Sequence, residues 1–266
     1  MSVPGEIAPR QDDPPYQPGE PVALFIPCYI DQFYPEIGKA TAALLRRQGC
    51  PVVFPAKQTC CGQPAFNSGY WDESRGVIQH FVRTFAPYRW IVCPSGSCAA
   101  MCRVFFGHVD PDEQVVEVGR RVFELTEFLV DMLGVTDTGA RFPHKVTLHV
   151  GCHGRRELGL DDQPLSLLRS VRGLDYVELP NAEECCGFGG TFSVKMAGTS
   201  IAMGQTKAEN ILRTGADVVT SPDVSCLMHF GGIMQCNPAM KHIRAMHIAE
   251  LLMQGVEAPA GVSTAP

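Results

Sequence analysis

The sequence predicts an α/β fold made of two tandem, pseudo-symmetric α/β repeats, each with a parallel-rich sheet and one Cys-Cys-Gly motif. Short apolar runs alternate with stretches of helical periodicity, which is typical of βαβ units and parallel sheets. The motif occurs at 60–62 and again at 185–187. A single cysteine precedes each copy by 32 or 33 residues, at Cys28 and at Cys152. This regular repetition indicates an internal duplication.

Three strands and two helices are expected in the first repeat. The strands are 22–26, 52–54 and 90–92, which are short and rich in β-branched and aromatic residues. Gly49 is placed to end the first helix, and Asp72 is placed to cap the second. The apolar stripes that predict these helices are Ile37, Thr41, Leu44 and Leu45, and then Val77, Ile78, Phe81, Val82 and Phe85.

The second repeat is expected to follow the same order. Its strands are predicted at 146–150, 174–179 and 217–220. A helix lies between the last two strands and ends at Gly215. Its apolar residues are Met196, Ile201, Ala208, Ile211 and Leu212.

The chain divides into four predicted segments. We expect a flexible arm over 1–20, a first CCG-motif domain over 21–138, a second over 139–254 and a flexible tail over 255–266. The arm contains five prolines and few residues that pack. Each repeat has the length of an ordinary domain.

Composition argues against several classes of function. The net charge of −6 and the lack of a basic run disfavour nucleic-acid binding. No apolar stretch approaches the roughly 20 residues that a membrane span needs. The N-terminus lacks the pattern of a signal peptide. We therefore expect a cytoplasmic protein without a membrane span, whose thiols stay reduced.

Eight of the twelve cysteines fall into two sets of four, one set in each repeat. In each repeat one cysteine follows the first predicted strand, the adjacent pair follows the second, and one follows the third. The carboxyl ends of parallel strands meet at one edge of a sheet, where ligands bind, so each set is expected to converge. The sets are Cys28, Cys60, Cys61 and Cys98, and Cys152, Cys185, Cys186 and Cys226.

Four thiolates brought together indicate a soft-metal centre, and iron–sulfur clusters are the leading hypothesis. Adjacent side chains of an extended segment point to opposite faces, so a vicinal pair suits a cluster of several irons better than a single ion. The glycine after the pair permits a sharp turn around the cluster. Zinc at one site is the alternative, although the chain has no C-x₂-C. Buried structural thiols are the third hypothesis.

The other four cysteines do not follow the repeat. The residue that matches Cys93 in the second repeat is Ser221, and the rest have no clear counterpart. A free buried cysteine behaves as a small hydrophobe, so we expect inert packing for most of them. They are Cys50, Cys93, Cys102 and Cys236.

Two histidines and several basic residues lie near the cysteines. His153 and His229 are candidates for tuning a ligand or donating a proton, although structurally satisfied histidines are commoner. The glycine-rich run 187–190 lacks the spacing of a dinucleotide fingerprint. The basic residues would hold an anionic substrate or an acidic partner, unless they are simply solvated. They are Lys57, Arg155, Arg156 and Lys195.

The joined motifs resemble the cysteine-rich CCG domain family of iron–sulfur oxidoreductases. The cysteine-rich component of heterodisulfide reductase and the glycolate oxidase iron–sulfur subunit carry two copies of this domain. The resemblance covers about 22–254 and is closest to the iron–sulfur subunit of an L-lactate dehydrogenase complex that serves lactate utilization. The segments that carry it are 57–70, 94–98, 184–196, 223–227 and 246–252.

The resemblance implies that the eight paired cysteines bind two iron–sulfur clusters. In the cysteine-rich component of heterodisulfide reductase the last element of the motif is C-x₂-C. Here its first cysteine is replaced by Ser95 in one repeat and by Asp223 in the other. Four thiols per copy suit an ordinary [4Fe–4S] cluster, so the disulfide-cleaving chemistry of that relative is not carried over.

The resemblance also implies a function as an iron–sulfur oxidoreductase subunit. Such a subunit passes electrons in the oxidation of L-lactate to pyruvate within a multisubunit complex, and a small 2-hydroxy acid is a candidate ligand. The chain lacks the C-x₂-C-x₂-C-x₃-C-P run, so a ferredoxin-type Fe–S partner subunit is expected. The alternatives are the same role for another 2-hydroxy acid such as glycolate, a heterodisulfide reductase B-like subunit, and a non-catalytic zinc or Fe–S binding protein.

Overall fold

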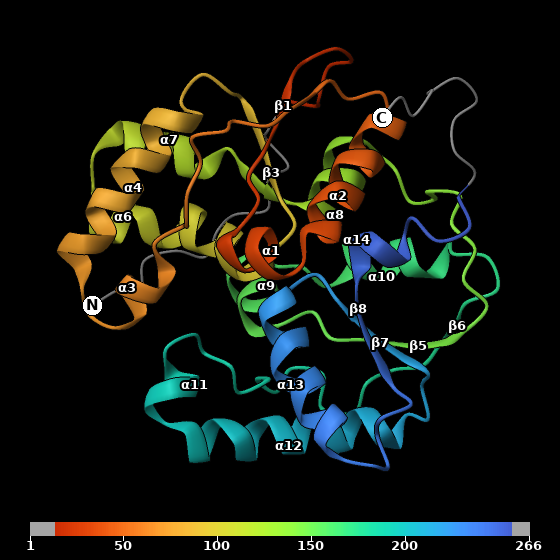
Figure 1. Ribbon diagram of the computed structural model, residues 1–266. Coiled ribbons are helices and arrows are strands. Elements are labelled where there is room, and N and C mark those ends of the chain that lie inside the picture. The colour runs from red at the N-terminus through yellow and green to blue at the C-terminus, as the bar shows by residue number, and fades with distance from the viewer. Residues whose placement is uncertain (1–13, 257–266) are drawn as a thin grey trace.

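Two four-stranded sheets, in which every neighbouring pair of strands is parallel, form the framework of the computed structural model, which describes residues 14–256 (Figure 1). The first sheet has the order β2-β1-β3-β4 and the second the order β6-β5-β7-β8. The two orders are the same once the second repeat is renumbered, so the predicted fold class of two tandem α/β repeats is confirmed.

The first repeat contains four strands and a larger number of short helices. Its elements are β1 (Val22–Leu24), α1 (Cys28–Phe33), α2 (Pro35–Arg47), β2 (Val52–Val53), α3 (Gln63–Asn67), α4 (Trp71–Phe85), β3 (Trp90–Cys93), α5 (Gly96–Ala100), the π-helical turn η2 (Met101–Phe105), α6 (Phe106–Val109), α7 (Glu113–Arg120), β4 (Val122–Glu124), α8 (Leu125–Glu127) and the π-helical turn η3 (Phe128–Met132).

The second repeat has the same succession of strands. Its elements are β5 (Lys145–Leu148), α9 (Cys152–Glu157), α10 (Asp162–Arg169), β6 (Asp175–Tyr176), α11 (Phe192–Lys195), α12 (Ala197–Arg213), β7 (Val218–Ser221), α13 (Val224–Cys236), β8 (Arg244–His247) and α14 (Ile248–Leu251).

The strand order places the ends of β1 and β3 side by side. Val22 is in register with Trp90, and Leu24 with Val92. The chain leaves β1 toward β2 on one side and later passes to β3 on the other, so the crevice between β1 and β3 is a topological switch point. The same holds for β5 and β7, where Leu148 is in register with Thr220. Ligands of open parallel sheets bind at such points.

The structure has a strand at each of the six places where the sequence predicted one. Each sheet also has a fourth strand that was not predicted. β4 has only three residues, and β8 lies at the edge of its sheet with Arg244 and Ala245 exposed. Neither segment shows the apolar alternation that marks a strand. Both pair in parallel with the strand before them in the sheet.

Two details of the helices differ from the sequence prediction. Asp72 does not cap α4, because the helix begins at Trp71 with Tyr70 at the N-cap, and Asp72 lies in the first turn. Met196 and Ile201 were expected on the buried stripe of α12, yet both are exposed. The buried face of α12 includes Ala208 and Ile211.

The two repeats pack through equivalent helices. α1 contacts α13, while α9 contacts α5. In the same way α2 contacts α14, while α10 contacts α8, and these four helices lie together in Figure 1. Each contact has its counterpart with the repeats exchanged, as in a two-fold interface. One buried apolar cluster extends from Val22 to Leu252 across both repeats.

The predicted flexible arm is described only from residue 14 onward. Tyr16 packs edge-on against Trp90 and Phe128, with ring centroids 5.9 and 5.8 Å away. Glu20 accepts a hydrogen bond from the Trp90 indole at 2.7 Å. Residues 1–13 of the predicted arm and 257–266 of the predicted tail lie outside the described residues. The predicted domain boundary near 138 stays a prediction.

Within residues 14–256, no helix combines the length and the apolar character that crossing a membrane requires.

Candidate metal centre

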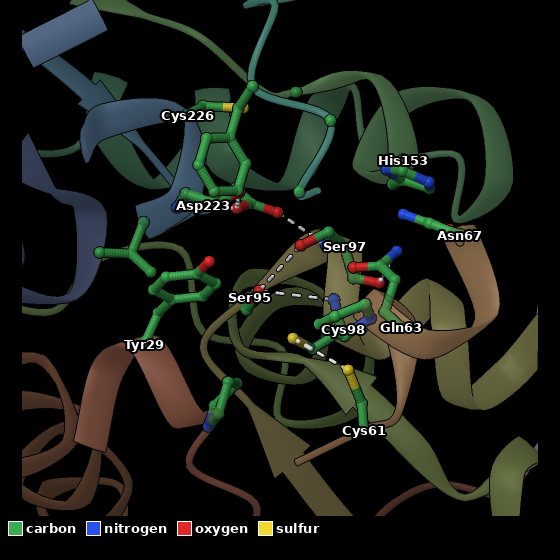
Figure 2. A pocket seen from close by; sticks show the side chains of 18 of the residues that line it. Tyr29, Cys61, Gln63, Asn67, Ser95, Ser97, Cys98, His153, Asp223 and Cys226 are labelled. Atoms are coloured by element: carbon green, nitrogen blue, oxygen red, sulfur yellow. Dashed lines mark hydrogen bonds between the residues drawn. The ribbon is translucent and has the colours of Figure 1, made fainter. Parts of the chain in front are cut away.

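All eight cysteines predicted as ligands line a single pocket between the two repeats (Figure 2). The sequence predicted that each set would converge at its own sheet edge. It did not predict that the two edges would face each other across one pocket. The lining also includes Tyr29 and Phe188, whose rings meet edge-on at 5.8 Å across the boundary between the repeats.

The first set brings four sulfur atoms together from three elements. Cys28 is the first residue of α1, Cys60 and Cys61 lie between β2 and α3, and Cys98 lies in α5. The Sγ atoms of Cys28 and Cys60 are 3.6 Å apart. Those of Cys61 and Cys98 are 3.5 Å apart. Cys61 and Cys98 are buried, whereas the other two are half-buried.

The second set repeats this arrangement. Cys152 is the first residue of α9, the adjacent pair follows β6, and Cys226 lies in α13. The Sγ atoms of Cys186 and Cys226 are 2.9 Å apart, and both residues are buried. Cys152 and Cys185 are half-buried. All of these cysteines are free thiols.

The glycine after each pair has a defined structural role. Gly62 and Gly187 have positive φ angles of 85° and 89°. Each donates its backbone N–H to the sulfur of the first cysteine of its pair, Cys60 or Cys185, at 3.4 Å. A side chain at Gly187 would place Cβ 2.7 Å from the Ser200 carbonyl oxygen, which is closer than real contacts allow. The sharp turn that the sequence predicted at the glycine is therefore observed.

One thiol in each set is held in its ionised form. The Cys28 S–H and then the Cys61 S–H lower the pKa of Cys60 to about 3. The equivalent donors, first Cys152 and then Cys186, lower the pKa of Cys185 to about 2. Thiolate is the form that binds metals. At neutral pH each set thus contains one thiolate, which accepts hydrogen bonds from two neighbouring thiols.

The positions that replace the cysteines of a C-x₂-C are helix N-caps. Ser95 Oγ accepts from the backbone N–H of Cys98, and Asp223 Oδ1 accepts from that of Ser225. Asp223 Oδ2 also accepts from the N–H of Ser97 in the other repeat at 2.7 Å, as Figure 2 shows. This buried carboxylate therefore holds the beginnings of α5 and α13 together, close to Cys98 and Cys226.

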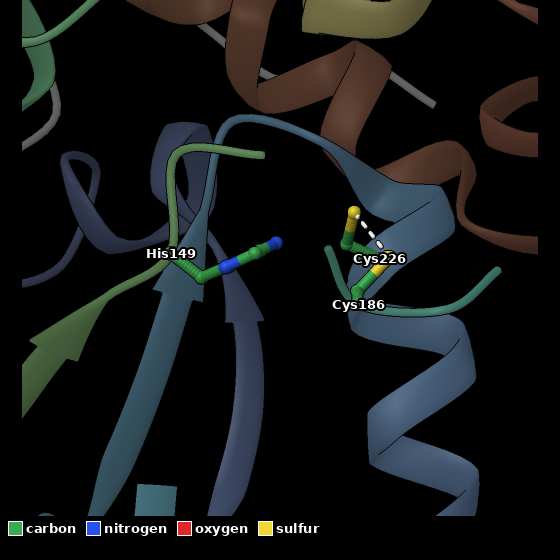
Figure 3. A group of neighbouring side chains, drawn as sticks. All are labelled: His149, Cys186 and Cys226. Carbon is green, nitrogen blue, oxygen red and sulfur yellow. Dashed lines mark hydrogen bonds between the residues drawn. The ribbon is translucent and has the colours of Figure 1, made fainter. Parts of the chain in front are cut away.

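One buried residue of this region had no signal in the sequence taken alone. His149 is fully buried, and both of its ring nitrogens lack a hydrogen-bond partner among the described residues. Its ring points toward Cys186 and Cys226, and the potential ligand atoms of the three residues lie within 4.8 Å of one another (Figure 3). A comparison of the repeats would have marked it, because the equivalent residue is Phe25, three positions before Cys28.

The weaker candidates have local explanations. His229 Nε2 lies 3.1 Å from the Ser200 carbonyl, so its position is accounted for by packing against α12. His153 lines the pocket, and its Nδ1 is 3.7 Å from Cys152 Sγ. Of the basic residues, Lys57, Lys195 and Arg156 are exposed and Arg155 pairs with Asp161.

The four cysteines outside the sets are placed as follows. Cys50, Cys93 and Cys102 are buried, and Cys236 is exposed. Burial raises the pKa of the Cys93 and Cys102 thiols, to which the nearby Cys98 also contributes. Both residues belong to the large buried apolar cluster, which agrees with a packing role.

The donor set fits an iron–sulfur centre in each repeat. Four sulfur atoms per site is the usual ligand number of a [4Fe–4S] cluster. The adjacent pair delivers its two sulfurs to different partners, Cys60 to Cys28 and Cys61 to Cys98, which separate irons would accommodate. His149 with Cys186 and Cys226 is also a mixed nitrogen and sulfur set of the kind that zinc accepts. Ligation by the eight cysteines stays a prediction.

Comparison with known proteins identifies relatives over almost the whole chain. A family model described as "Cysteine-rich domain" (CCG) matches residues 22–103 and 146–231. A protein of Exiguobacterium sp. is 47% identical over 245 residues, which cover 89% of this chain and 98% of the relative. One of Anoxybacillus flavithermus is 48% identical over 235 residues, and one of Bacillus subtilis is 44% identical over 236; each alignment covers 87% of this chain and 98% of the relative. All three are named Lactate utilization protein A.

Proposed function

The chain belongs to the cysteine-rich CCG domain family, with two copies of the domain, and on this premise we propose that it is an iron–sulfur electron-transfer subunit of a complex that oxidises L-lactate to pyruvate. The proposed ligands are Cys28, Cys60, Cys61 and Cys98 for a first [4Fe–4S] centre, and Cys152, Cys185, Cys186 and Cys226 for a second.

One observation carries the proposal. Two sets of four thiols, each with the same distribution of buried and half-buried cysteines, line one pocket. A pair of one-electron centres in one pocket suits electron transfer, whereas a purely structural metal would not require the two sites to face each other. The relatives' printed name supplies the substrate, because those proteins serve lactate utilization.

The stoichiometry agrees with this role. Oxidation of L-lactate to pyruvate releases two electrons and two protons, so an electron carrier in the complex must take up both electrons. When bound, two iron–sulfur centres would each accept one electron. The eight cysteines would hold the centres, and Tyr29, Phe188 and Asp223 line the same pocket.

Partner subunits are part of the proposal. The chain has neither a dinucleotide fingerprint nor a ferredoxin-type cysteine run, so another subunit must remove hydrogen from the substrate and a ferredoxin-type Fe–S protein must relay electrons. We propose the cytoplasm as the compartment, because closely spaced thiols must stay reduced to bind metal.

The alternatives differ in how much the site supports them. For another 2-hydroxy acid such as glycolate, the relatives' printed name is what favours lactate instead. A heterodisulfide reductase B-like role is disfavoured, because Ser95 and Asp223 cap helices where that chemistry has cysteines. The observation that supports the zinc alternative is the cluster of His149, Cys186 and Cys226 at the second site.

Metal analysis of anaerobically purified protein tests the proposal. We expect about eight irons and eight sulfides per chain, a broad visible absorption band and an EPR signal that appears on reduction. Stoichiometric zinc without sulfide would refute the iron–sulfur assignment, because closed-shell zinc gives neither signal.

An activity assay tests the need for partner subunits. The purified chain alone should not oxidise lactate, and lactate-dependent dye reduction by it would place the whole active site on this chain.

A further inference from the structure

A polar residue, His149, lies in the protein interior beside the second set of cysteines, where apolar side chains are usual. His149 follows β5 and is fully buried, and neither ring nitrogen has a partner among the described residues. Leaving a buried N–H unpaired costs stability, so such a group calls for an explanation. The ring is aimed at Cys186 and Cys226 (Figure 3), so a group bound to those sulfurs would lie in front of it.

The equivalent position in the first repeat is aromatic. Phe25 takes the place of His149, and its ring meets that of Phe81 edge-on at 4.9 Å. Both phenylalanines are buried. Neither side chain of this aromatic pair can donate a classical hydrogen bond or carry a charge.

A lysine replaces the second phenylalanine. Ser74 and Ser200 mark equivalent positions, because each donates its hydroxyl to the carbonyl of the glycine after the cysteine pair. Seven residues further along lie Phe81 in the first repeat and Lys207 in the second. Lys207 is fully buried, and its Nζ donates to the Asn181 carbonyl at 2.7 Å.

We propose that His149 is a positioning residue that donates an N–H to a sulfur of the second centre, and that with Lys207 it makes this centre the easier of the two to reduce. The inference rests on the proposed iron–sulfur function. Reduction adds negative charge, which a hydrogen bond to sulfur and a nearby cationic side chain both stabilise. Phe25 and Phe81 supply neither at the first centre.

Burial supports a neutral imidazole at His149. Burial, with Lys207 as the next contribution, lowers the pKa of His149 to about 3, so the imidazole stays uncharged and carries one N–H. Burial lowers the pKa of Lys207, and the Glu184 carboxylate, the next contribution, acts in the opposite direction. The second repeat therefore has a buried histidine and a buried lysine where the first repeat has two phenylalanines.

Redox titration of the full chain, purified anaerobically and followed by EPR, tests this inference. We expect two midpoint potentials in the native chain. His149→Phe, which installs the residue of the first repeat, should keep the iron content and lower the higher potential toward the other. His149→Gln retains an N–H donor and should restore at least half of that shift. Lys207→Met, which retains His149, should lower the same midpoint potential.

Phe25→Leu is the matched control, because it changes packing behind the first centre without adding or removing a donor, and it should move neither potential. Unchanged potentials in both His149→Phe and Lys207→Met would overturn the inference. Loss of about half the iron in both His149 variants would also overturn it, because His149 would then be a ligand. Failure of the proposed function is distinguishable, since the native chain would show no reducible centre before any variant is made.

Discussion

The two repeats agree in backbone and ligand positions but differ in the residues that surround the cysteines. Both sheets have the same strand order, and both sets contain two buried and two half-buried thiols. Around them the first repeat has Phe25 and Ser95 where the second has His149 and Asp223. Duplication has therefore preserved the positions of the cysteines, while the polar groups around them have diverged.

The difference extends to the interface between the repeats. Asp223 reaches across to the Ser97 N–H, whereas the shorter Ser95 bonds within its own helix and to the Ser97 hydroxyl. His247 Nε2 lies 3.1 Å from the Pro94 carbonyl of the first repeat, whereas its counterpart Glu124 bonds only within its own repeat. At these two positions the second repeat supplies the side chain that crosses the boundary.

The largest expected effect concerns the cysteine that completes the first set. Cys98 Sγ is 3.5 Å from Cys61 Sγ, whereas the fully buried Cys93 directs its sulfur toward the Ser95 carbonyl. Cys98 matches Cys226, and Cys93 matches Ser221. We expect Cys98→Ser to lose about half the iron, one of two equal clusters, and Cys93→Ser to keep nearly all of it. Iron analysis of both variants decides; the reverse pattern would show that the repeats bind differently.

The next effect compares the two motif glycines. Gly187→Ala forces Cβ to 2.7 Å from the Ser200 backbone oxygen at a positive φ, whereas at Gly62 the nearest atom is the Ser74 hydroxyl at 3.1 Å. We expect Gly187→Ala to lower the free energy of unfolding by about 2–6 kcal/mol and Gly62→Ala by clearly less. Urea unfolding of the metal-free chain measures both.

The control for the glycine pair is Gly49, which has a φ of 81° and open space around it. Gly49→Ala tests backbone strain alone, which we expect to cost about 1–2 kcal/mol. Equal decreases in the free energy of unfolding for Gly187→Ala and Gly49→Ala would show that the close approach to Ser200 does not contribute to the cost.

A smaller effect is expected at the polar link between the repeats. Asp223→Ser gives the second repeat the residue of the first and keeps an N-cap for α13, but it removes the bond to the Ser97 N–H. A charge-assisted hydrogen bond contributes about 1.5–3 kcal/mol, so we expect a loss of this size in urea unfolding. Ser95→Ala, which removes only a local cap, should cost about 1 kcal/mol. A larger loss from Ser95→Ala would mean that the link across the repeats is not the stronger contact.

The sequence predicted what depends on local pattern and missed what depends on how distant segments meet. Six strands and both cysteine sets followed from apolar runs and spacing. The fourth strands escaped because β4 is short and β8 is an exposed edge. The shared pocket depends on contacts between helices far apart in the chain, such as α2 with α14. His149 was missed because a single histidine after an apolar strand carries no signal until it is compared with Phe25.

The smallest expected effect contrasts two equivalent titratable residues at the ends of β4 and β8. Burial raises the pKa of Glu124 from 4.5 to about 8, whereas burial lowers the pKa of His247 from 6.5 to about 4. Between pH 4.5 and 8 the native state holds a proton on Glu124 that the unfolded state has released, so this residue makes stability fall as pH rises. His247 makes stability rise with pH, because between pH 4 and 6.5 it is less protonated in the native state than in the unfolded state.

Glu124→Gln should remove the first of these contributions. Relative to the native chain, the free energy of unfolding of this variant should rise by about 1 kcal/mol per pH unit between pH 6.5 and 7.5. The titrating thiols are common to both chains, so they cancel in this difference. His247→Gln is the control. Its difference from the native chain should fall by less than about 0.5 kcal/mol over the same interval, because the unfolded state releases only its remaining His247 protons there. A flat difference for Glu124→Gln in urea unfolding at these pH values would show that Glu124 is ionised in the folded protein, and that the repeats do not differ in this respect.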